Sequence, residues 1–370
     1  MLRKSVACAG LLATILAAGA PAQTALKDAF QPFFRIGAAL NSAQYTERNA
    51  AAAALVKAQF NTITPENDLK WERIHPRPDS YNFGPADRYV EFGERNGMFI
   101  VGHCLVWHSQ VPGWVFQDGK GNPLDRDGLL QRMREHIQTV VGRYKGRVNG
   151  WDVVNEALNE DGTMRKSPWS AIGDDYILKA FQYAHEADPK AELYYNDYSL
   201  ENETKRRGAV ELVRKLKAQG ATITAVGLQG HDSLDWPTVE QQDATIAAFK
   251  ALGVKVSITE LDIDVLPSAN QGPTADVSST AANGANPYTA GLPDEVQRKL
   301  AKHYGELFGV FLKYRDVVQR VTFWGVGDGD SWKNSFPVRG RTNYPLLFDR
   351  AYQAKPAFDA VIAAARAARR

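Results

Sequence analysis

Short apolar runs rich in β-branched and aromatic residues alternate along this chain with longer stretches in which apolar residues recur at helical spacing. The short runs predict strands at residues 33–39, 60–64, 99–106, 148–154, 191–195, 225–229, 255–259 and 320–324. The longer stretches predict helices that include residues 47–59, 129–144, 176–187, 204–219, 238–252 and 294–313. Eight strands that alternate with helices predict a parallel sheet closed into a (β/α)8 TIM barrel, a single-domain α/β fold.

A doubly wound open sheet is the alternative fold for the same alternation of strands and helices. The nucleotide-binding form of that fold carries a G-x-G-x-x-G or a G-x-x-x-x-G-K-[ST] motif. The sequence contains neither motif, and this favours the barrel.

One segment interrupts the alternation. Residues 267–293 are rich in Pro, Gly, Ser, Ala, Asn and Thr, and Asp276 is the only charged residue among them. Such a segment has too little apolar surface to order itself strongly. We predict a long loop after the seventh strand, and a flexible insertion rather than a linker, because the eighth strand still has to follow.

The N-terminus has the pattern of an export signal. Arg3 and Lys4 precede an apolar run over residues 6–18, and Ala20 and Ala22 provide the small residues of a cleavage site before Gln23. The run is too short to span a membrane, and no later apolar run is long enough to do so. We therefore expect a signal peptide at 1–22, a catalytic domain at 23–370, and a secreted or periplasmic product without a transmembrane helix.

Removal of the signal peptide changes the charge and cysteine counts. The full chain has 44 basic and 42 acidic residues, and residues 1–22 contain two basic and no acidic ones, which leaves 42 of each sign. A net charge near zero gives no reason to expect nucleic acid or an anionic membrane as a partner. Only Cys104 remains, so no intrachain disulfide is possible. We expect a monomer.

Polar residues gather at the C-terminal ends of the predicted strands. The sequence reads TPENDLKW, GHCLVWH, WDVVNE, YYNDY, GLQGH, ITELD and FWGVGDGDSW at the ends of strands two to eight. All of these ends lie on one rim of a parallel barrel, where the active sites of such barrels are found. The convergence of seven polar strand ends predicts an active site there.

Two carboxyl groups, Glu156 and Glu260, each close an apolar strand. Two carboxyls in one cleft can cleave a glycosidic bond if one is protonated and the other ionised, and two neighbouring carboxyls separate their pKa values in this way. Side chains alternate across a strand, so Glu260 shares a face with Asp262. We predict that His231 bonds to both and keeps Glu260 ionised.

The same alternation argues against a metal centre or a cofactor. His103 shares a face with Trp107, whereas His108 points the other way, so the two histidines do not form a ligand pair. The sequence also lacks H-E-x-x-H and C-x-x-C motifs. Instead, indole rings and hydrogen-bonding side chains near the strand ends predict sugar binding. These residues are Glu66, Asn67, Lys70, His103, Trp107, Asn155, Gln229, Trp324 and Trp332.

With these motifs, the sequence closely resembles glycoside hydrolase family 10, the retaining endo-β-1,4-xylanases. The resemblance rests on ENDLKW, GHCLVWHSQVPGW, GWDVVNEAL, YYNDY, GLQGH, ITELDI and FWGVGDGDSW, and it covers residues 33–358. It implies that Glu156 is the general acid/base and Glu260 the nucleophile. His231 and Asp262 are implied to support Glu260, and Asn155 to bond the 2-hydroxyl of the sugar under attack.

The resemblance also implies a set of substrate-binding residues for xylan or xylo-oligosaccharides, with no cofactor. For the sugar under attack these are Lys70, His103, Trp107, Gln229, Trp324 and Trp332. For the neighbouring sugars they are Glu66 and Asn67 on the glycone side, and Asn196 and Tyr198 on the leaving-group side.

Two features depart from the family pattern. The 267–293 loop is longer than in a minimal member, which leaves the leaving-group side of the cleft open to question. Cys104 replaces a small polar residue, and its place in the strand faces it away from the sugar. Three other functions compete with a xylanase. These are a β-glucanase on the same barrel, a xylan-binding protein without catalysis, and a metal-dependent hydrolase.

Overall fold

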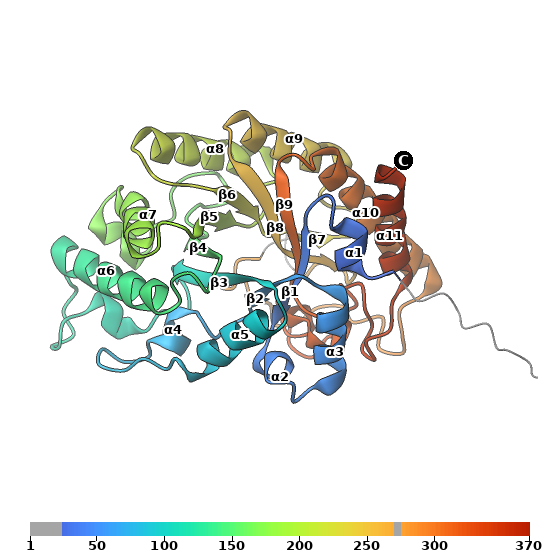
Figure 1. Cartoon of the computed structure of the whole chain (residues 1–370), viewed down its shortest axis with the longest axis horizontal. Helices are drawn as coiled ribbons and strands as arrows, with labels where there is room; N and C mark the ends of the chain where they lie inside the picture. The colour runs from blue at the N-terminus through green and yellow to red at the C-terminus, as the bar shows by residue number, and fades with distance from the viewer. Residues whose placement is uncertain (1–23, 270–274) are drawn as a thin grey trace, which may run out of the picture.

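The computed structural model describes residues 24–269 and 275–370. The predicted signal peptide at 1–22 lies outside the described residues. The described chain forms a ring of strands surrounded by helices (Figure 1). None of the helices in these two ranges has both the length and the apolar character needed to cross a bilayer.

The strands form one parallel sheet that closes on itself. Its members are β1 (Arg35–Leu40), β2 (Thr62–Pro65), β3 (Phe99–Val106), β4 (Gly150–Asn155), β5 (Glu192–Asp197), β6 (Ala225–Leu228), β7 (His231–Ser233), β8 (Lys255–Asp264) and β9 (Val318–Phe323). Neighbours pair in the order β6-β5-β4-β3-β2-β1-β9-β8-β7, and β6 also pairs with β8. This last pairing closes the ring, so the predicted (β/α)8 barrel is confirmed.

The sixth position of the barrel is shared by two strand segments. β6 ends at Leu228, the chain turns at Gly230, whose φ is 73°, and β7 begins at His231. A positive φ is easily adopted by glycine, which has no Cβ to clash with the backbone. The turn lets β7 pair with the far end of β8, where His231 lies opposite Asp262. The prediction for residues 225–229 missed β7, and the prediction for 255–259 missed the extension of β8 to Asp264.

Helices cover the outside of the barrel. The longer ones are α3 (Ala50–Gln59), α5 (Gly84–Arg95), α6 (Arg126–Arg143), α7 (Tyr176–Ala187), α8 (Glu203–Ala218), α9 (Val239–Ala251), α10 (Asp294–Lys313) and α11 (Pro356–Ala368). Single turns form α1 (Leu26–Phe30), α2 (Ser42–Tyr45) and α4 (Trp71–Ile74), and short 3-10 segments occur at Gly113–Phe116, Pro168–Ile172, Asp328–Asp330 and Trp332–Asn334. α1 lies beside α11, so the two ends of the described chain meet (Figure 1). α5 and α11 lie outside the helices predicted from the sequence.

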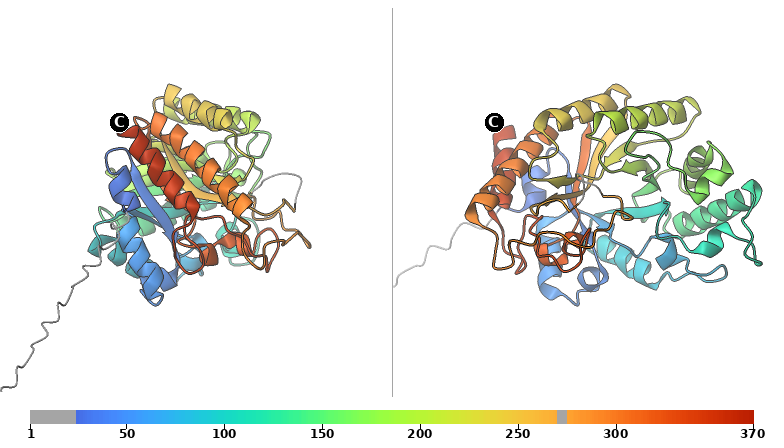
Figure 2. Two further views of the ribbon diagram at one scale, coloured as in Figure 1. Left: turned by 90° about the vertical axis from the view of Figure 1, so that its right-hand side faces the viewer. Right: turned by 180° about the vertical axis from the view of Figure 1, so that it is seen from behind.

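The connection from β8 to α10 contains no helix or strand in its described residues, 265–269 and 275–293. It lies against the segment between β9 and α11 (Figure 2). The amide N of Ala281 donates to the Pro337 carbonyl at 3.0 Å, and the Tyr344 hydroxyl donates to the Tyr288 carbonyl at 2.8 Å. The long connection is therefore attached to the rim at several points.

Candidate active site

A cavity of about 400 Å³ opens at the C-terminal ends of the strands. Its lining residues lie on or follow β2, β3, β4, β6, β7, β8 and β9, and they are Glu66, Asn67, Lys70, His103, Trp107, Ser109, Gln110, Asn155, Glu156, Gln229, His231, Glu260, Ala275, Val277, Trp324 and Trp332. A second cavity of about 360 Å³ lies behind Lys333 and Asp264 and shares no lining residue with the first. The first cavity therefore brings together Glu156 and Glu260, the two carboxyl groups singled out in the sequence.

Glu156 lies one residue beyond β4 and is only 4% exposed. Its Oε2 accepts a hydrogen bond from the Trp107 indole at 2.7 Å. Its Oε1 accepts from the Gln229 amide at 2.9 Å and from the Asn155 amide at 3.2 Å. The backbone φ of Glu156 is 57°, in the left-handed region that non-glycine residues rarely adopt. Such a conformation, held by surrounding structure, is typical of functional positions.

Burial raises the pKa of Glu156 to about 7, because a carboxylate loses its hydration in the cavity. The charges of Asp197 and Glu260 act in the same direction, whereas the hydrogen bonds from Gln229 and Trp107 lower the pKa, and burial, the largest of these effects, decides the outcome. Glu156 is therefore partly protonated at neutral pH.

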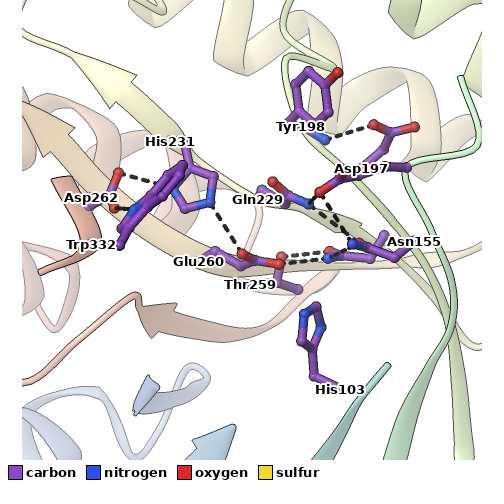
Figure 3. A network of polar contacts seen from close by, with 12 residues as sticks. His103, Asn155, Asp197, Tyr198, Gln229, His231, Thr259, Glu260, Asp262 and Trp332 are labelled. Carbon is purple, nitrogen blue, oxygen red and sulfur yellow. Dashed lines mark hydrogen bonds and ion pairs between the residues drawn. The ribbon is translucent and has the colours of Figure 1, made fainter. Parts of the chain in front are cut away.

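Glu260 lies within β8 and is as deeply buried as Glu156, at 4% exposed. Its Oε2 is 3.2 Å from Nε2 of His231, and its Oε1 accepts a hydrogen bond from the Asn196 amide at 2.8 Å. The other ring nitrogen of His231, Nδ1, is 3.0 Å from Oδ1 of Asp262. The Trp332 indole donates to the second oxygen of Asp262 at 2.7 Å. Figure 3 shows this chain from Trp332 to Glu260.

The histidine carries a positive charge next to Glu260. Burial lowers the pKa of His231, but the Asp262 carboxylate and Glu260 overcome this and raise the pKa to about 9. Burial in turn raises the pKa of Glu260, yet the hydrogen bond from His231 and the nearby charges of His103 and His231 leave it below its usual value. Glu260 is therefore ionised under conditions in which Glu156 holds a proton.

Asparagine amides join the two carboxyl groups. The Asn196 amide nitrogen, which bonds to Glu260, also donates to Oδ1 of Asn155 at 2.9 Å. The Thr259 hydroxyl donates to the Asn196 amide oxygen at 2.6 Å and fixes its orientation. A Cβ at Gly227 would lie 2.2 Å from that same oxygen, so only glycine leaves room for Asn196. The two acidic side chains are thus linked through Asn155 and Asn196, and Figure 3 shows Asn155, Thr259 and Glu260 of this network.

The remaining predicted residues fall into two groups around the carboxyls. Lys70 lies with its ammonium 5.1 Å from the centre of the Trp107 ring and donates to the Asn67 amide oxygen at 3.0 Å. Burial raises the pKa of Glu66. Trp324 packs edge-on against His103, with ring centres 5.4 Å apart. Glu66, Asn67 and Lys70 thus follow β2, and Trp324 and Trp332 follow β9.

Two predicted substrate residues lie elsewhere. Asn196 and Tyr198 were expected to face the leaving-group side, but neither lines the cavity, and both are buried. Asn196 lies beneath the carboxyls because its amide is used by Asn155 and Glu260. The ring of Tyr198 turns away from Glu260 (Figure 3), and its hydroxyl accepts a hydrogen bond from Arg165 at 2.7 Å.

Several residues of the site were not predicted. Asp152 lies 2.8 Å from Nδ1 of His103 and orients the ring. A bulge between Asp152 and Val154 interrupts the alternation along β4, but an acidic residue inside an apolar strand could have signalled its role. No such signal marks Ser109 and Gln110, nor Ala275 and Val277, which the chain brings to the cavity from loops. His108 lines a small cavity of about 10 Å³ with Trp169, on the other side of its strand.

No group of three or more His, Cys, Asp or Glu side chains that could hold a metal ion occurs in the part of the chain that the structure describes. Cys104 is buried and unpaired there, and burial raises the pKa of its thiol well above the usual value.

A closed parallel barrel with two buried carboxyl groups of opposite pKa shift, surrounded by amides and indoles in one cavity at its strand ends, defines a glycoside hydrolase of the (β/α)8 class. Known proteins agree with this assignment. The family model described as "Glycosyl hydrolase family 10" matches residues 25–364. The chain belongs to glycosyl hydrolase family 10.

Individual relatives are similar along nearly their whole length. The endo-1,4-beta-xylanase A of Xylanibacter ruminicola is 45% identical over 358 residues, which cover 96% of this chain and 97% of the relative. The beta-1,4-xylanase of Dictyoglomus thermophilum is 45% identical over 337 residues, which cover 90% of this chain and 89% of the relative. The solved structure of a GH10 endoxylanase from a sugarcane soil metagenome has a TM-score of 0.89 and 47% identity, and the match covers 91% of this chain and 99% of that one.

Proposed function

We propose that this protein is a secreted endo-β-1,4-xylanase that hydrolyses internal bonds of xylan by double displacement with retention of configuration. The observation that carries the proposal is the opposite protonation of two equally buried carboxyls in one cavity. Burial raises the pKa of Glu156 to about 7, whereas the His231 hydrogen bond and the neighbouring positive charges hold the pKa of Glu260 below its usual value. The relatives named above are xylanases, and they supply the substrate class.

In the proposed first step, Glu156 donates its proton to the glycosidic oxygen while the Glu260 carboxylate attacks the anomeric carbon. The bond to the leaving sugar breaks, and a covalent glycosyl-enzyme forms at Glu260. In the second step, Glu156, now ionised, takes a proton from a water that attacks the same carbon and releases Glu260. Two inversions give net retention. The amide chain from Glu156 through Asn155 and Asn196 to Glu260 supports retention, because retaining enzymes hold their two carboxyls close together.

The supporting residues act through Glu260. His231 is charged at neutral pH, and its two ring N–H groups donate to Glu260 and Asp262. We infer that this pair keeps Glu260 from taking up the proton that Glu156 needs. Asn155 would bond the 2-hydroxyl of the sugar under attack, a contact that strengthens as charge develops on the ring.

The cavity offers a place for the glycone sugars. Glu66, Asn67 and Lys70 present one carboxyl, one amide and one ammonium group for hydroxyls, and the indoles of Trp324 and Trp332 present apolar faces. We propose that the half-buried Trp332 and the buried Lys70 leave no room for the hydroxymethyl group that distinguishes glucose from xylose. A β-glucanase would need that room.

We also propose that residues 1–22 direct export and are removed, which gives a secreted or periplasmic enzyme. The supporting pattern is the basic, apolar and small-residue order of the N-terminus. N-terminal sequencing of the protein recovered outside the cytoplasm of an expressing bacterium should begin at Gln23.

Proton NMR of xylohexaose hydrolysis tests the proposal. Retention requires that the β-anomer of the new reducing end accumulates first and then mutarotates. Initial rates on xylan and on carboxymethylcellulose measure the substrate class in the same preparation, and xylan should be strongly preferred. The α-anomer as first product would overturn double displacement, and equal rates on both polymers would overturn the xylanase assignment.

A further inference from the structure

Two small apolar residues of the long β8–α10 connection form part of the catalytic cavity. Ala275 is buried and Val277 is half-buried, and both line the cavity that contains Glu156 and Glu260. Neither side chain can form a hydrogen bond. These two residues, which we call the wall, can therefore only pack their side chains against a sugar or exclude one. The described residues of the connection form no helix or strand that would hold these two residues in place.

The residue between them, Asp276, attaches the wall to the barrel. Its Oδ2 is 3.0 Å from Nη1 of Arg165, which lies in the connection that follows β4. Its Oδ1 accepts hydrogen bonds from the Ser278 amide at 3.0 Å and the Ser278 hydroxyl at 2.6 Å. The side chains of Asp276 and Arg165 are 19% and 15% exposed, so water screens this ion pair less than a pair on the open surface.

Arg165 is itself held from below by Tyr198. The Nη2 of Arg165 donates to the Tyr198 hydroxyl at 2.7 Å, and that hydroxyl is also 3.5 Å from Oδ2 of Asp276. The ring of Tyr198 lies under the ammonium of Lys205, 3.4 Å from the ring centre, and Lys205 pairs with the fully buried Asp197 at 3.0 Å. A continuous set of contacts therefore runs from the end of β5 to the long connection.

We propose that this clasp, made of Arg165, Asp276 and Tyr198, holds Ala275 and Val277 in place as a wall of the cavity and thereby sets which leaving-group sugars the enzyme accepts. The inference rests on the proposed xylanase function. The clasp reaches the rim from β4 and β5, whereas the glycone residues Glu66, Asn67 and Lys70 follow β2, three positions from β5 in the sheet. The wall thus belongs to the part of the rim away from the glycone residues.

The chemistry of the wall defines the preferred ligand. Methyl groups of Ala275 and Val277 can contact the C–H face of a flat, unbranched xylosyl residue, and they offer no partner for the hydroxyls of a branch. A fixed wall therefore favours an unbranched sugar on the leaving-group side and disfavours one that carries an arabinose substituent. Loosening the wall should weaken the preference for an unbranched sugar and reduce the discrimination against an arabinose-substituted one.

The test compares substrates that do and do not reach the wall. 4-Nitrophenyl β-xylobioside places only a nitrophenyl group on the leaving-group side, whereas xylohexaose places sugars there. Asp276→Ala removes the carboxylate, and Tyr198→Phe removes only the hydroxyl that bonds to Arg165. In both variants we expect kcat/KM for xylohexaose to fall about tenfold, the cost of one lost charge-assisted contact. For the aryl xylobioside we expect a change within about twofold, the size of effect expected when no contact to the reacting groups is lost. The ratio of kcat/KM for unbranched to arabinose-branched oligosaccharides should fall as well.

Two further variants separate the clasp from general effects. Asp175→Ala breaks the exposed ion pair between Asp175, in the connection between β4 and α7, and Arg126, at the start of α6. Neither residue lines the cavity, so kcat/KM should change for neither substrate. Val277→Ala trims the wall and leaves the clasp, so combining it with Asp276→Ala should add little to the effect of Asp276→Ala alone.

Each outcome decides something. If wild type hydrolyses neither xylohexaose nor the aryl xylobioside, the proposed function fails. If wild type hydrolyses both and folded Asp276→Ala and Val277→Ala retain the wild-type ratio between the substrates, the clasp inference fails alone. An equal loss on both substrates in Asp276→Ala also overturns it, because a wall on the leaving-group side cannot affect the aryl substrate to the same degree.

Discussion

Glu156, just after β4, and Glu260, within β8, carry the same functional group at the same depth, yet they are held in opposite protonation states. Glu156 and Glu260 are both 4% exposed. Neutral donors surround Glu156, namely an indole and two amides, and burial raises its pKa to about 7. Burial also acts on Glu260, but the charged His231 reverses the outcome. The nature of the partner, neutral or charged, thus decides which carboxyl holds the proton.

Removing the nucleophile should cause the largest loss of activity. Glu260→Ala should lower kcat on xylan by about 10⁵-fold, because the covalent step is lost. Added azide should restore turnover of an activated aryl β-xylobioside and give α-xylobiosyl azide, since azide attacks from the face that Glu260 occupied. Steady-state kinetics measure the rate, and NMR of the product gives its anomeric configuration. A β-configured azide product would contradict the assignment of Glu260.

Removing the proton donor should cost less and should depend on the leaving group. Glu156→Ala is expected to lower kcat/KM on xylan by about 10³-fold, the usual contribution of general acid–base catalysis. 2,4-Dinitrophenolate leaves without protonation, so the first step on 2,4-dinitrophenyl β-xylobioside should be nearly unaffected. Glu160→Ala, four residues along the chain, serves as the control. Equal losses on both substrates would mean that Glu156 is not the acid.

Neutralising the partner of His231 should make the two carboxyls more alike. Asp262→Asn removes the charge that raises the pKa of His231, so His231 becomes neutral at lower pH and the pKa of Glu260 rises. Because Glu260 must be ionised, the acid limb of the kcat/KM profile should move to higher pH, and the value at the optimum should fall about 10- to 100-fold, as for other partners of catalytic side chains. Asp264→Asn, on the same strand and bonded to Asn343 rather than His231, should leave the limb unchanged.

The smallest expected effect concerns Asp197. After burial, its negative charge is the largest cause that raises the pKa of Glu156, and it exceeds that of Glu260. Glu156 must be protonated in the first step, so the wild-type alkaline limb of kcat/KM should lie near pH 7 and move to lower pH in Asp197→Asn. Tyr195→Phe removes a hydrogen bond to Asp197 without changing charge and should leave the limb in place. A limb that moves to higher pH in Asp197→Asn would contradict this electrostatic role.

Much of the fold was accessible from the sequence because its elements are strongly patterned. The predicted bounds of β3, α7 and α10 agree with the structure, and the closed barrel is confirmed. β7 was not predictable in the same way, since three consecutive polar residues show no strand pattern. It forms because Gly230 turns the chain and β8 extends far enough to pair with it. Pairing with a distant strand is a tertiary effect that no local pattern carries.

The placement of residues in the site divides similarly. Side chains that point into the barrel mouth from regular strands, such as Glu260, could be placed by their alternation along the strand. Asn196 and Tyr198 could not, because their hydrogen bonds to Asn155, Glu260 and Arg165 come from other segments. These partners draw both side chains out of the cavity and into the supporting structure.

The sequence by itself determined the barrel, its polar rim and the pair of acidic residues, because each of these follows from a periodicity or from residues at the end of a strand. Only the tertiary structure decided which donors contact the two carboxyls and which loop residues close the cavity. Both depend on contacts between segments far apart in the chain: Trp107 and Gln229 with Glu156, His231 with Glu260, and Arg165 with Asp276. Electrostatic and packing interactions act through space, and the order of residues does not record those distances.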